Sequence, residues 1–279
     1  MEPRAASSSR PARAPRLLAA LVAATVGLAV SLAPGAGAQT TVPTTPGPPA
    51  TAPTVAVPAP SPVKPPAGGY QLSDERTKTY WAHAAGDGVV HAIPTINGAE
   101  VTRLHLLTED GAAEVYIVLR VYVDGAKRTW LRVRVPRRPN GTTGWVLARA
   151  LGPVHKTSTH LVIDREHLVA TLYRAGAVIW SSPVGVGKPT TPTPRGNFWI
   201  REKLVALGGS NPIYGPYALG TSAYSVLTDW PGGGVVGIHG TNQPELIPGR
   251  PSHGCVRVPN PAIIRLYRLI TVGTPVTIV

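Results

Sequence analysis

Cysteine is almost missing from this sequence, since Cys255 is the only one among its 279 residues. A single cysteine excludes a disulfide within the chain. Zinc binding is also disfavoured, because Cys255, His253 and His239 do not follow a standard ligand spacing. We therefore predict no metal and no cofactor. One cysteine with histidines close by in sequence is instead typical of a nucleophile and its base.

Acidic residues are also scarce: 14 of them stand against 27 lysines and arginines, for a formal charge of +13. A cationic protein favours anionic surroundings such as cell-wall polymers. A nucleic-acid partner would require a clustered basic patch or a recognisable motif. The basic residues are spread along the chain and neither feature is visible. We therefore predict no nucleic-acid partner.

Long apolar runs are missing everywhere except near the start of the chain. The stretch Leu17–Ala33 follows a basic segment and precedes Ala36-Gly37-Ala38, the small-residue pattern of a signal peptidase site. We predict a signal peptide over 1–38, an exported extracytoplasmic protein, and no membrane span after cleavage. The alternative is an uncleaved anchor, although the apolar run is short for a span of about 20 residues.

Residues 39–69 form the next segment, which contains almost only Pro, Thr, Ala, Val and Gly. Such a composition buries too little apolar surface to offset the entropy of ordering the chain. We therefore predict a disordered, extended linker that leads into the folded part of the protein.

Residues 70–152 have the pattern of a small β domain. Turn signals at Asp124-Gly125 and Pro139-Asn140-Gly141 separate short apolar stretches that are typical of strands. We expect these strands at 114–123, 129–135 and 143–146. Trp130 and Trp145 are expected to pack in the core or at the rim of the barrel, and the alternative is a platform for a ligand. The stretch around Trp130 and the segment Gly144-Trp145-Val146 resemble a bacterial SH3-like domain, which is a small β-barrel. The resemblance leaves open whether 70–152 binds the cell wall or only acts as a spacer.

Residues 153–279 are predicted to be mostly β with one late helix. Strand-like stretches recur, and the helix is expected to begin at Asn260 as N-cap with Pro261 as its first helical residue. Apolar residues then follow at helical spacing. The expected strands are 161–164, 168–173, 177–186, 198–207, 234–238 and 276–279, and the apolar helix positions are Ile263, Ile264, Tyr267 and Ile270.

Three runs in this segment carry a family resemblance. They are His239-Gly240-Thr241, then Ser252-His253-Gly254-Cys255-Val256-Arg257, and upstream Thr191-Pro192-Thr193-Pro194-Arg195-Gly196. Together they resemble the signature of the L,D-transpeptidase catalytic domain, which belongs to exported cysteine transferases of bacterial peptidoglycan. The resemblance implies a mainly β protein, in which a β-rich, sandwich-like catalytic domain with a late helix follows the SH3-like barrel.

The resemblance also implies roles for individual residues. Cys255 is the expected nucleophile, and His239 is the expected base, with its ring oriented by the carbonyl of Gly240. Backbone amides of His253, Gly254 and Cys255 are expected to form an oxyanion hole.

For the neighbouring residues the functional and structural roles are weighed together. Ser252 is expected to support the loop by hydrogen bonding. Arg257 is equally compatible with binding a substrate carboxylate and with locking the loop. Residues 211–224, with Tyr214 and Tyr217, either cover the site and touch substrate or are packing residues.

The implied substrates are peptidoglycan stem peptides, as acyl donor and as amine acceptor. The reaction would release the terminal D-amino acid of a tetrapeptide and form a 3→3 cross-link, and carbapenems would acylate the cysteine. Two alternatives remain at this point. One is an L,D-carboxypeptidase that uses water on the same site, and the other is a catalytically inactive cell-wall-binding protein.

Overall fold

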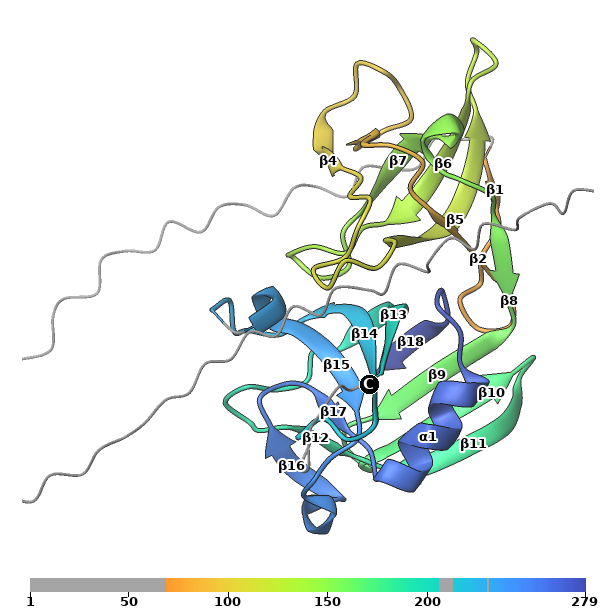
Figure 1. Ribbon diagram of the computed structural model, residues 1–279. Coiled ribbons are helices and arrows are strands. Elements are labelled where there is room, and N and C mark those ends of the chain that lie inside the picture. The colour runs from red at the N-terminus through yellow and green to blue at the C-terminus, as the bar shows by residue number, and fades with distance from the viewer. Residues whose placement is uncertain (1–68, 206–212, 230) are drawn as a thin grey trace, which may run out of the picture. The chain divides into compact units, whose positions relative to one another are not determined.

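The computed structural model describes residues 69–205, 213–229 and 231–279 (Figure 1). The predicted signal peptide, and all of the predicted linker except its last residue, lie outside the described residues. Within them the protein is mainly β, as predicted, and has a single α-helix. No helix in these ranges has the length and apolar character needed to cross a membrane.

The first sheet contains eight strands in the order β4-β3-β7-β6-β5-β2-β8, and β1 also pairs with β5. The predicted strands in this region lie where expected, and both Trp130 and Trp145 are buried. The strands are β1 (Tyr70–Gln71), β2 (Thr79–His83), β3 (Val89–His91), β4 (Glu100–Arg103), β5 (Val115–Val123), β6 (Thr129–Arg134), β7 (Thr143–Leu147) and β8 (His155–Thr157). A short 3₁₀ turn, Ala148–Ala150, follows β7.

The turn between β5 and β6 is fixed by one residue of the turn itself, Asp124. The carboxylate of Asp124 accepts the backbone amides of Ala126 and Arg128, each at 2.9 Å, which closes the turn. Its other oxygen accepts the indole N–H of Trp130 at 2.9 Å. One aspartate therefore forms the turn and satisfies the polar end of a buried tryptophan.

The second sheet contains ten strands in the order β11-β10-β9-β18-β13-β14-β15-β17-β12-β16. The strands are β9 (Thr159–Asp164), β10 (Val169–Arg174), β11 (Ala177–Pro183), β12 (Gly185–Gly187), β13 (Gly196–Val205), β14 (Tyr217–Tyr224), β15 (Val235–His239), β16 (Gly249–Ser252), β17 (Val256–Arg257) and β18 (Pro275–Ile278). The helix is α1 (Asn260–Leu269), and short 3₁₀ turns lie at Pro231–Gly234 and Pro244–Leu246. The predicted strand 198–207 starts two residues late, and its last two residues lie outside the described ranges.

Strand β13 joins two halves of this sheet, β11-β10-β9-β18 on one side and β14-β15-β17-β12-β16 on the other. Its first residues pair with β18, whereas the residues from Ile200 onward pair with β14. The two halves share one hydrophobic core, to which Leu161 and Leu172 contribute from one half, Leu219 and Ile238 from the other, and Ile263 from α1. The strands that carry the candidate site, β15 and β17, are therefore anchored in the main core of the sheet.

The start of α1 differs from the prediction. Asn260 is the first helical residue rather than the N-cap, the flanking residue is Pro259, and no side chain caps the helix. The side chain of Asn260 has another partner, because its Oδ1 accepts the backbone amide of Thr241 at 2.9 Å. The helix start therefore holds the segment that follows His239.

The first sheet extends further along the chain than the predicted boundary at 152/153. β8 pairs with β2 across His155–Thr157, and β9 begins at Thr159. All described residues belong to one compact unit. The sheets meet at a small cluster of Val115, Ile117 and Trp199, where the Trp199 indole donates to the Val115 carbonyl at 2.7 Å.

Candidate active site

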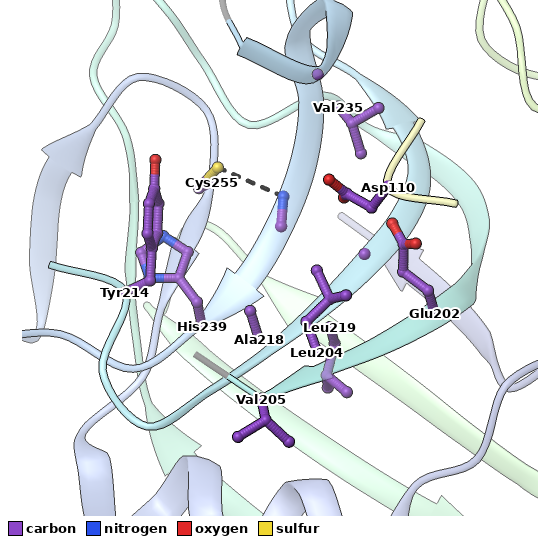
Figure 2. A pocket seen from close by; sticks show the side chains of 13 residues that line it. Asp110, Glu202, Leu204, Val205, Tyr214, Ala218, Leu219, Val235, His239 and Cys255 are labelled. Atoms are coloured by element: carbon purple, nitrogen blue, oxygen red, sulfur yellow. Dashed lines mark hydrogen bonds between the residues drawn. The ribbon is translucent and has the colours of Figure 1, made fainter. Parts of the chain in front are cut away.

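Cys255 lies in the short loop between β16 and β17 and is half-buried. β15 and β17 run parallel with Ile238 opposite Val256, so Gly237 lies opposite Cys255. The backbone amide of Gly237 donates to the cysteine Sγ at 3.4 Å (Figure 2). The thiol therefore lies against β15, and the Gly237 amide is a hydrogen-bond donor to its sulfur.

The cysteine loop is held from inside by Ser252. Its hydroxyl donates to the Cys255 carbonyl at 2.6 Å and accepts the Gly254 amide at 3.1 Å. Gly254 has φ +127°, and a Cβ there would lie 3.1 Å from the Cβ of Ser225. Only glycine fits this conformation without strain. The Gly254 amide, one of the predicted oxyanion donors, donates to Ser252 within the loop in this structure.

Thr193 supports the same loop and is a residue whose contribution the sequence did not reveal. Its buried hydroxyl donates to the Gly254 carbonyl at 2.8 Å and accepts the Gly187 amide at 2.9 Å. Thr193 belongs to one of the three runs that carry the family resemblance. Its spacing from Cys255 gives no sign of this contact, which depends on β12 lying beside β17.

His239 is the last residue of β15 and is buried. Its Nδ1 lies 2.5 Å from the carbonyl oxygen of Gly240. A carbonyl only accepts, so Nδ1 carries the proton and Nε2 is left as the basic nitrogen. The ring of Tyr214 packs edge-on against the imidazole, with ring centroids 4.9 Å apart. The imidazole is thus fixed both in tautomer and in orientation.

The site disfavours charge on both reactive groups. Burial lowers the pKa of His239 to about 4, against the opposing effect of its hydrogen bond to Gly240. Burial also raises the pKa of the Cys255 thiol, although the Gly237 amide and the Arg257 guanidinium act in the other direction. At neutral pH the resting pair is therefore a neutral imidazole and a protonated thiol, rather than an ion pair.

Two cavities adjoin the cysteine. The larger, of about 380 Å³, extends along β13, β14 and β15, and the smaller, of about 190 Å³, lies beside the cysteine loop. Both are lined by Tyr214, Val235, His239 and Cys255. Both cavities therefore reach the same thiol.

The structure brings most of the predicted site residues together. His253 and Arg257 line the smaller cavity along with Ser252, and Nη1 of Arg257 donates to Oε1 of Gln243 at 2.9 Å. Gly240 packs close to Gly215 and to the Asn260 side chain, where an added Cβ would lie 2.4 Å from the asparagine oxygen.

The predicted cover over 211–224 is only partly reproduced. Tyr214 lies against the imidazole and lines both cavities. Tyr217, by contrast, is the first residue of β14 and stacks on Tyr267 of α1 at 4.2 Å between ring centroids. The residues from 217 to 224 form an inner strand rather than a cover, so the structure does not bring Tyr217 to the site. Residues 211 and 212 lie outside the described ranges.

Two acidic residues of the larger cavity were missed at the level of sequence. Glu202 lies on β13, and Asp110 comes from a turn that precedes β5 in the first sheet (Figure 2). Neither stands near a recognised motif in the sequence. No local signal could have placed them in the same cavity as Cys255, because their position depends on how the two sheets pack.

The site brings together a half-buried cysteine directly before β17 and a buried, oriented histidine at the end of β15, the residue types that a cysteine nucleophile and its base require. The family description "YkuD: L,D-transpeptidase catalytic domain" matches residues 158–278. The chain is 34% identical over 119 residues to the putative L,D-transpeptidase YkuD of Bacillus subtilis, which covers 43% of this chain and 65% of that protein. It is 30% identical over 134 residues to the putative L,D-transpeptidase YqjB of the same organism, which covers 45% of this chain and 68% of that protein. The chain belongs to the L,D-transpeptidase catalytic domain family.

Among solved structures, the chain is similar to the catalytic domain of the E. faecium L,D-transpeptidase acylated by ertapenem. The identity is 29% and the TM-score 0.34, over 45% of this chain and 99% of that one. The matched region of this chain spans about two thirds of the length of the Bacillus relatives.

Proposed function

We propose that this protein is an exported L,D-transpeptidase that forms 3→3 peptidoglycan cross-links through a thioester on Cys255. The observation that carries the proposal is the pairing of Cys255 with an imidazole whose Nδ1 is fixed by the Gly240 carbonyl. Family membership supports the same reaction class.

The first half of the reaction forms the acyl-enzyme. Nε2 of His239 takes the thiol proton while Sγ attacks the amide carbonyl that follows the third residue of a tetrapeptide stem. The tetrahedral intermediate collapses, and the imidazolium gives its proton to the departing amine of the terminal D-amino acid. The Gly237 amide stabilises the negative charge that develops on sulfur as the proton leaves, since it donates to Sγ. The backbone amides of His253, Gly254 and Cys255 are the proposed donors to the oxyanion, and for this role the Gly254 amide would exchange its bond to Ser252 for one to the oxyanion.

The second half transfers the acyl group. An amine of a second stem attacks the thioester carbonyl, His239 accepts the proton that the amine loses, and the thiolate departs and is reprotonated. The two cavities that share Cys255 and His239 suit a reaction with a donor and an acceptor. An L,D-carboxypeptidase would use water in the second half, and the same residues would serve it.

The experiment incubates the protein with a tetrapeptide stem and a D-amino acid acceptor, and follows the products by mass spectrometry. We expect exchange of the terminal residue, together with 3→3 dimers when a second stem is present. Release of the terminal residue without exchange would instead identify a carboxypeptidase.

A carbapenem tests whether the site is active at all. We expect a covalent adduct on Cys255, no adduct in Cys255→Ala, and acylation slowed by orders of magnitude in His239→Ala while the fold survives. An intact mass that is unchanged at saturating drug would favour an inactive wall-binding protein.

Location and wall contact complete the proposal. The basic start of the chain, its apolar run and its small-residue site support export through a cleaved signal over 1–38, followed by a linker over 39–69. We further propose that the β region 70–152 is SH3-like and either binds the cell wall or orients the catalytic region. Retention of the full-length protein on purified cell wall, compared with its retention on a wall-free matrix, tests the wall contact.

A further inference from the structure

The carbonyl that orients His239 belongs to a peptide group with a second partner. In a planar trans peptide, the carbonyl of one residue and the amide N–H of the next point in opposite directions from the same plane. The Gly240 carbonyl accepts from Nδ1 of His239, and the Thr241 amide donates to Oδ1 of Asn260 at 2.9 Å. One peptide group therefore lies between the imidazole and the Asn260 side chain, with a hydrogen bond on each side.

These two hydrogen bonds fix the rotation of the peptide plane. A glycine at position 240 restricts the backbone little by itself. The Gly240 amide donates to the Tyr217 carbonyl at 3.2 Å, which is at the long end of the usual range. The bond from Thr241 to Asn260 acts on the plane from the side opposite to the imidazole. Its loss would free the plane to rotate and would take the acceptor away from Nδ1.

Two glycines make the room that the Asn260 side chain occupies. A Cβ on Gly240 or on Gly215 would lie 2.4 Å from Oδ1 of Asn260. Gly215 has φ +62°, which glycine adopts without strain, and it follows Tyr214, whose ring packs against the imidazole (Figure 2). The asparagine therefore lies between the two segments that hold the His239 ring, one carrying its acceptor and the other its packing partner.

A rigid element carries this asparagine. Asn260 is the first residue of α1, and Ile263 and Leu266 of the same helix are fully buried in the main core. The Ile263 amide donates to the Pro259 carbonyl at 2.9 Å, so the first turn of the helix is formed. Asparagine at a helix start ordinarily accepts from the backbone of its own helix, and here no side chain does so. Its oxygen serves Thr241 instead, outside the helix.

We propose that Asn260 is a positioning residue for the general base His239. It acts through the Gly240–Thr241 peptide, which holds the proton of the imidazole on Nδ1. Nε2 is then free to take the thiol proton of Cys255. Hydrogen bonds in series polarise one another, so the Asn260 oxygen also makes the Gly240 carbonyl a stronger acceptor. The inference rests on the proposed function for the reaction that the base serves, and on the geometry alone for the tautomer.

The tautomer of His239 can be measured on the full chain without any substrate. Nitrogen NMR of protein labelled with ¹⁵N-histidine separates a protonated from an unprotonated ring nitrogen. Comparison with His239→Gln identifies the signals of this ring among the eight histidines. At pH 7.5 we expect the wild type to carry the proton on Nδ1. A proton on Nε2 in the wild type would overturn the proposal, whatever the variants do.

Two variants separate the oxygen of Asn260 from the rest of its side chain. Asn260→Ala removes the acceptor, so we expect a mixture of both His239 tautomers and carbapenem acylation slowed by about ten-fold to a hundred-fold. Asn260→Asp keeps an oxygen in the same place, and a negative charge suits the start of a helix. It should keep the proton on Nδ1 and react at close to the wild-type rate.

Ile263→Val is the matched control, because it weakens the packing of the same helix without touching the peptide. It should lower the urea midpoint and keep the wild-type tautomer and acylation rate. A merely structural role for Asn260 predicts that Asn260→Ala behaves in the same way, so an unchanged tautomer or an unchanged rate in that variant would refute the proposal. If Asn260→Ala does not fold, Asn260→Asp decides: a retained Nδ1 proton supports the proposal, and its loss in a folded protein refutes it.

The same measurements keep this inference apart from the proposed function. If the wild type forms no carbapenem adduct, the transferase function fails, while the tautomers still decide the role of Asn260. If wild type and Asn260→Ala are acylated at the same rate, with the proton on Nδ1 in both, the transferase function stands and the role of Asn260 fails.

Discussion

The guanidinium of Arg201 and the carboxylate of Glu114 form a bidentate ion pair buried between the two sheets. Nε of Arg201 lies 2.8 Å from Oε1 of Glu114, and Nη2 contacts Oε2. Both residues are close in sequence to a residue that lines the larger cavity. Glu114 follows the turn that carries Asp110, and Arg201 directly precedes Glu202 on β13. The pair therefore ties the first sheet to the cavity.

We expect removal of one partner of this pair to destabilise the protein strongly. Glu114→Gln leaves the buried guanidinium short of negative charge, which typically costs about 3–5 kcal/mol. Urea unfolding of the wild type and the variant measures the loss. The double variant Arg201→Met, Glu114→Leu should recover much of it, because two apolar side chains need no partners. A loss below about 1 kcal/mol in Glu114→Gln would contradict this account.

Arg138 connects the first sheet to the edge of the cysteine cavity, and we expect its removal to slow acylation. Its guanidinium donates to the carbonyls of Ser225, Leu227 and Gly233, at 2.8–2.9 Å. Ser225 packs on Gly254 beside the cysteine. Arg138→Ala should reduce the rate of carbapenem adduct formation about ten-fold, with little change in the unfolding midpoint. Arg103→Ala, at an exposed position, is the control, and equal rates for the two variants would contradict the prediction.

Ser252 tests how far the loop geometry controls the nucleophile. Ser252→Ala leaves the Gly254 amide and the Cys255 carbonyl without their shared partner, which costs about 1–3 kcal/mol for buried groups. We expect acylation to fall by about ten-fold to a hundred-fold while the protein still folds. Adduct mass and circular dichroism measure the two effects. Ser181→Ala on β11 removes a hydroxyl far from the site, and should react at the wild-type rate.

The protonated state of the resting thiol predicts a particular pH profile. Because burial raises the pKa of Cys255, alkylation by iodoacetamide should be slow near neutral pH and should rise only above about pH 8.5, the ordinary thiol value. Arg257→Gln should shift the rise to still higher pH, since the guanidinium favours the thiolate. A plateau of fast alkylation between pH 5 and 8 would indicate a thiolate–imidazolium pair and contradict the prediction.

The sequence revealed contacts made within a motif better than contacts made between distant segments. Cys255, Ser252 and His239 stand in short runs whose chemistry and mutual proximity could be anticipated. The prediction of Asn260 as the helix N-cap was wrong, because its side chain accepts a hydrogen bond from the backbone amide of Thr241 and does not cap the helix. Asp110 was missed because a turn in one sheet meets a bulge of β13 in the other. Such a meeting leaves no periodicity in either segment.

His239 gives the fold itself a pH dependence whose sign can be derived. Burial lowers the pKa of this imidazole in the folded protein to about 4, from an ordinary 6.5. Between these values the unfolded chain binds a proton that the folded protein does not. The free energy of unfolding is therefore highest above about pH 6.5 and falls as the pH drops toward 4, by up to about 3 kcal/mol.

Removing the imidazole should remove that dependence. Urea unfolding of His239→Gln at pH 7.5, 5.5 and 4 should show a smaller decline than the wild type. His167 provides a control of opposite sign, because its hydrogen bond to Asp164 raises the pKa of its exposed imidazole. Its proton stabilises the fold at low pH, so His167→Gln should make the decline slightly steeper. Identical slopes for the wild type and His239→Gln would show that the imidazole is not buried in its neutral form, and the general-base assignment would lose its physical basis.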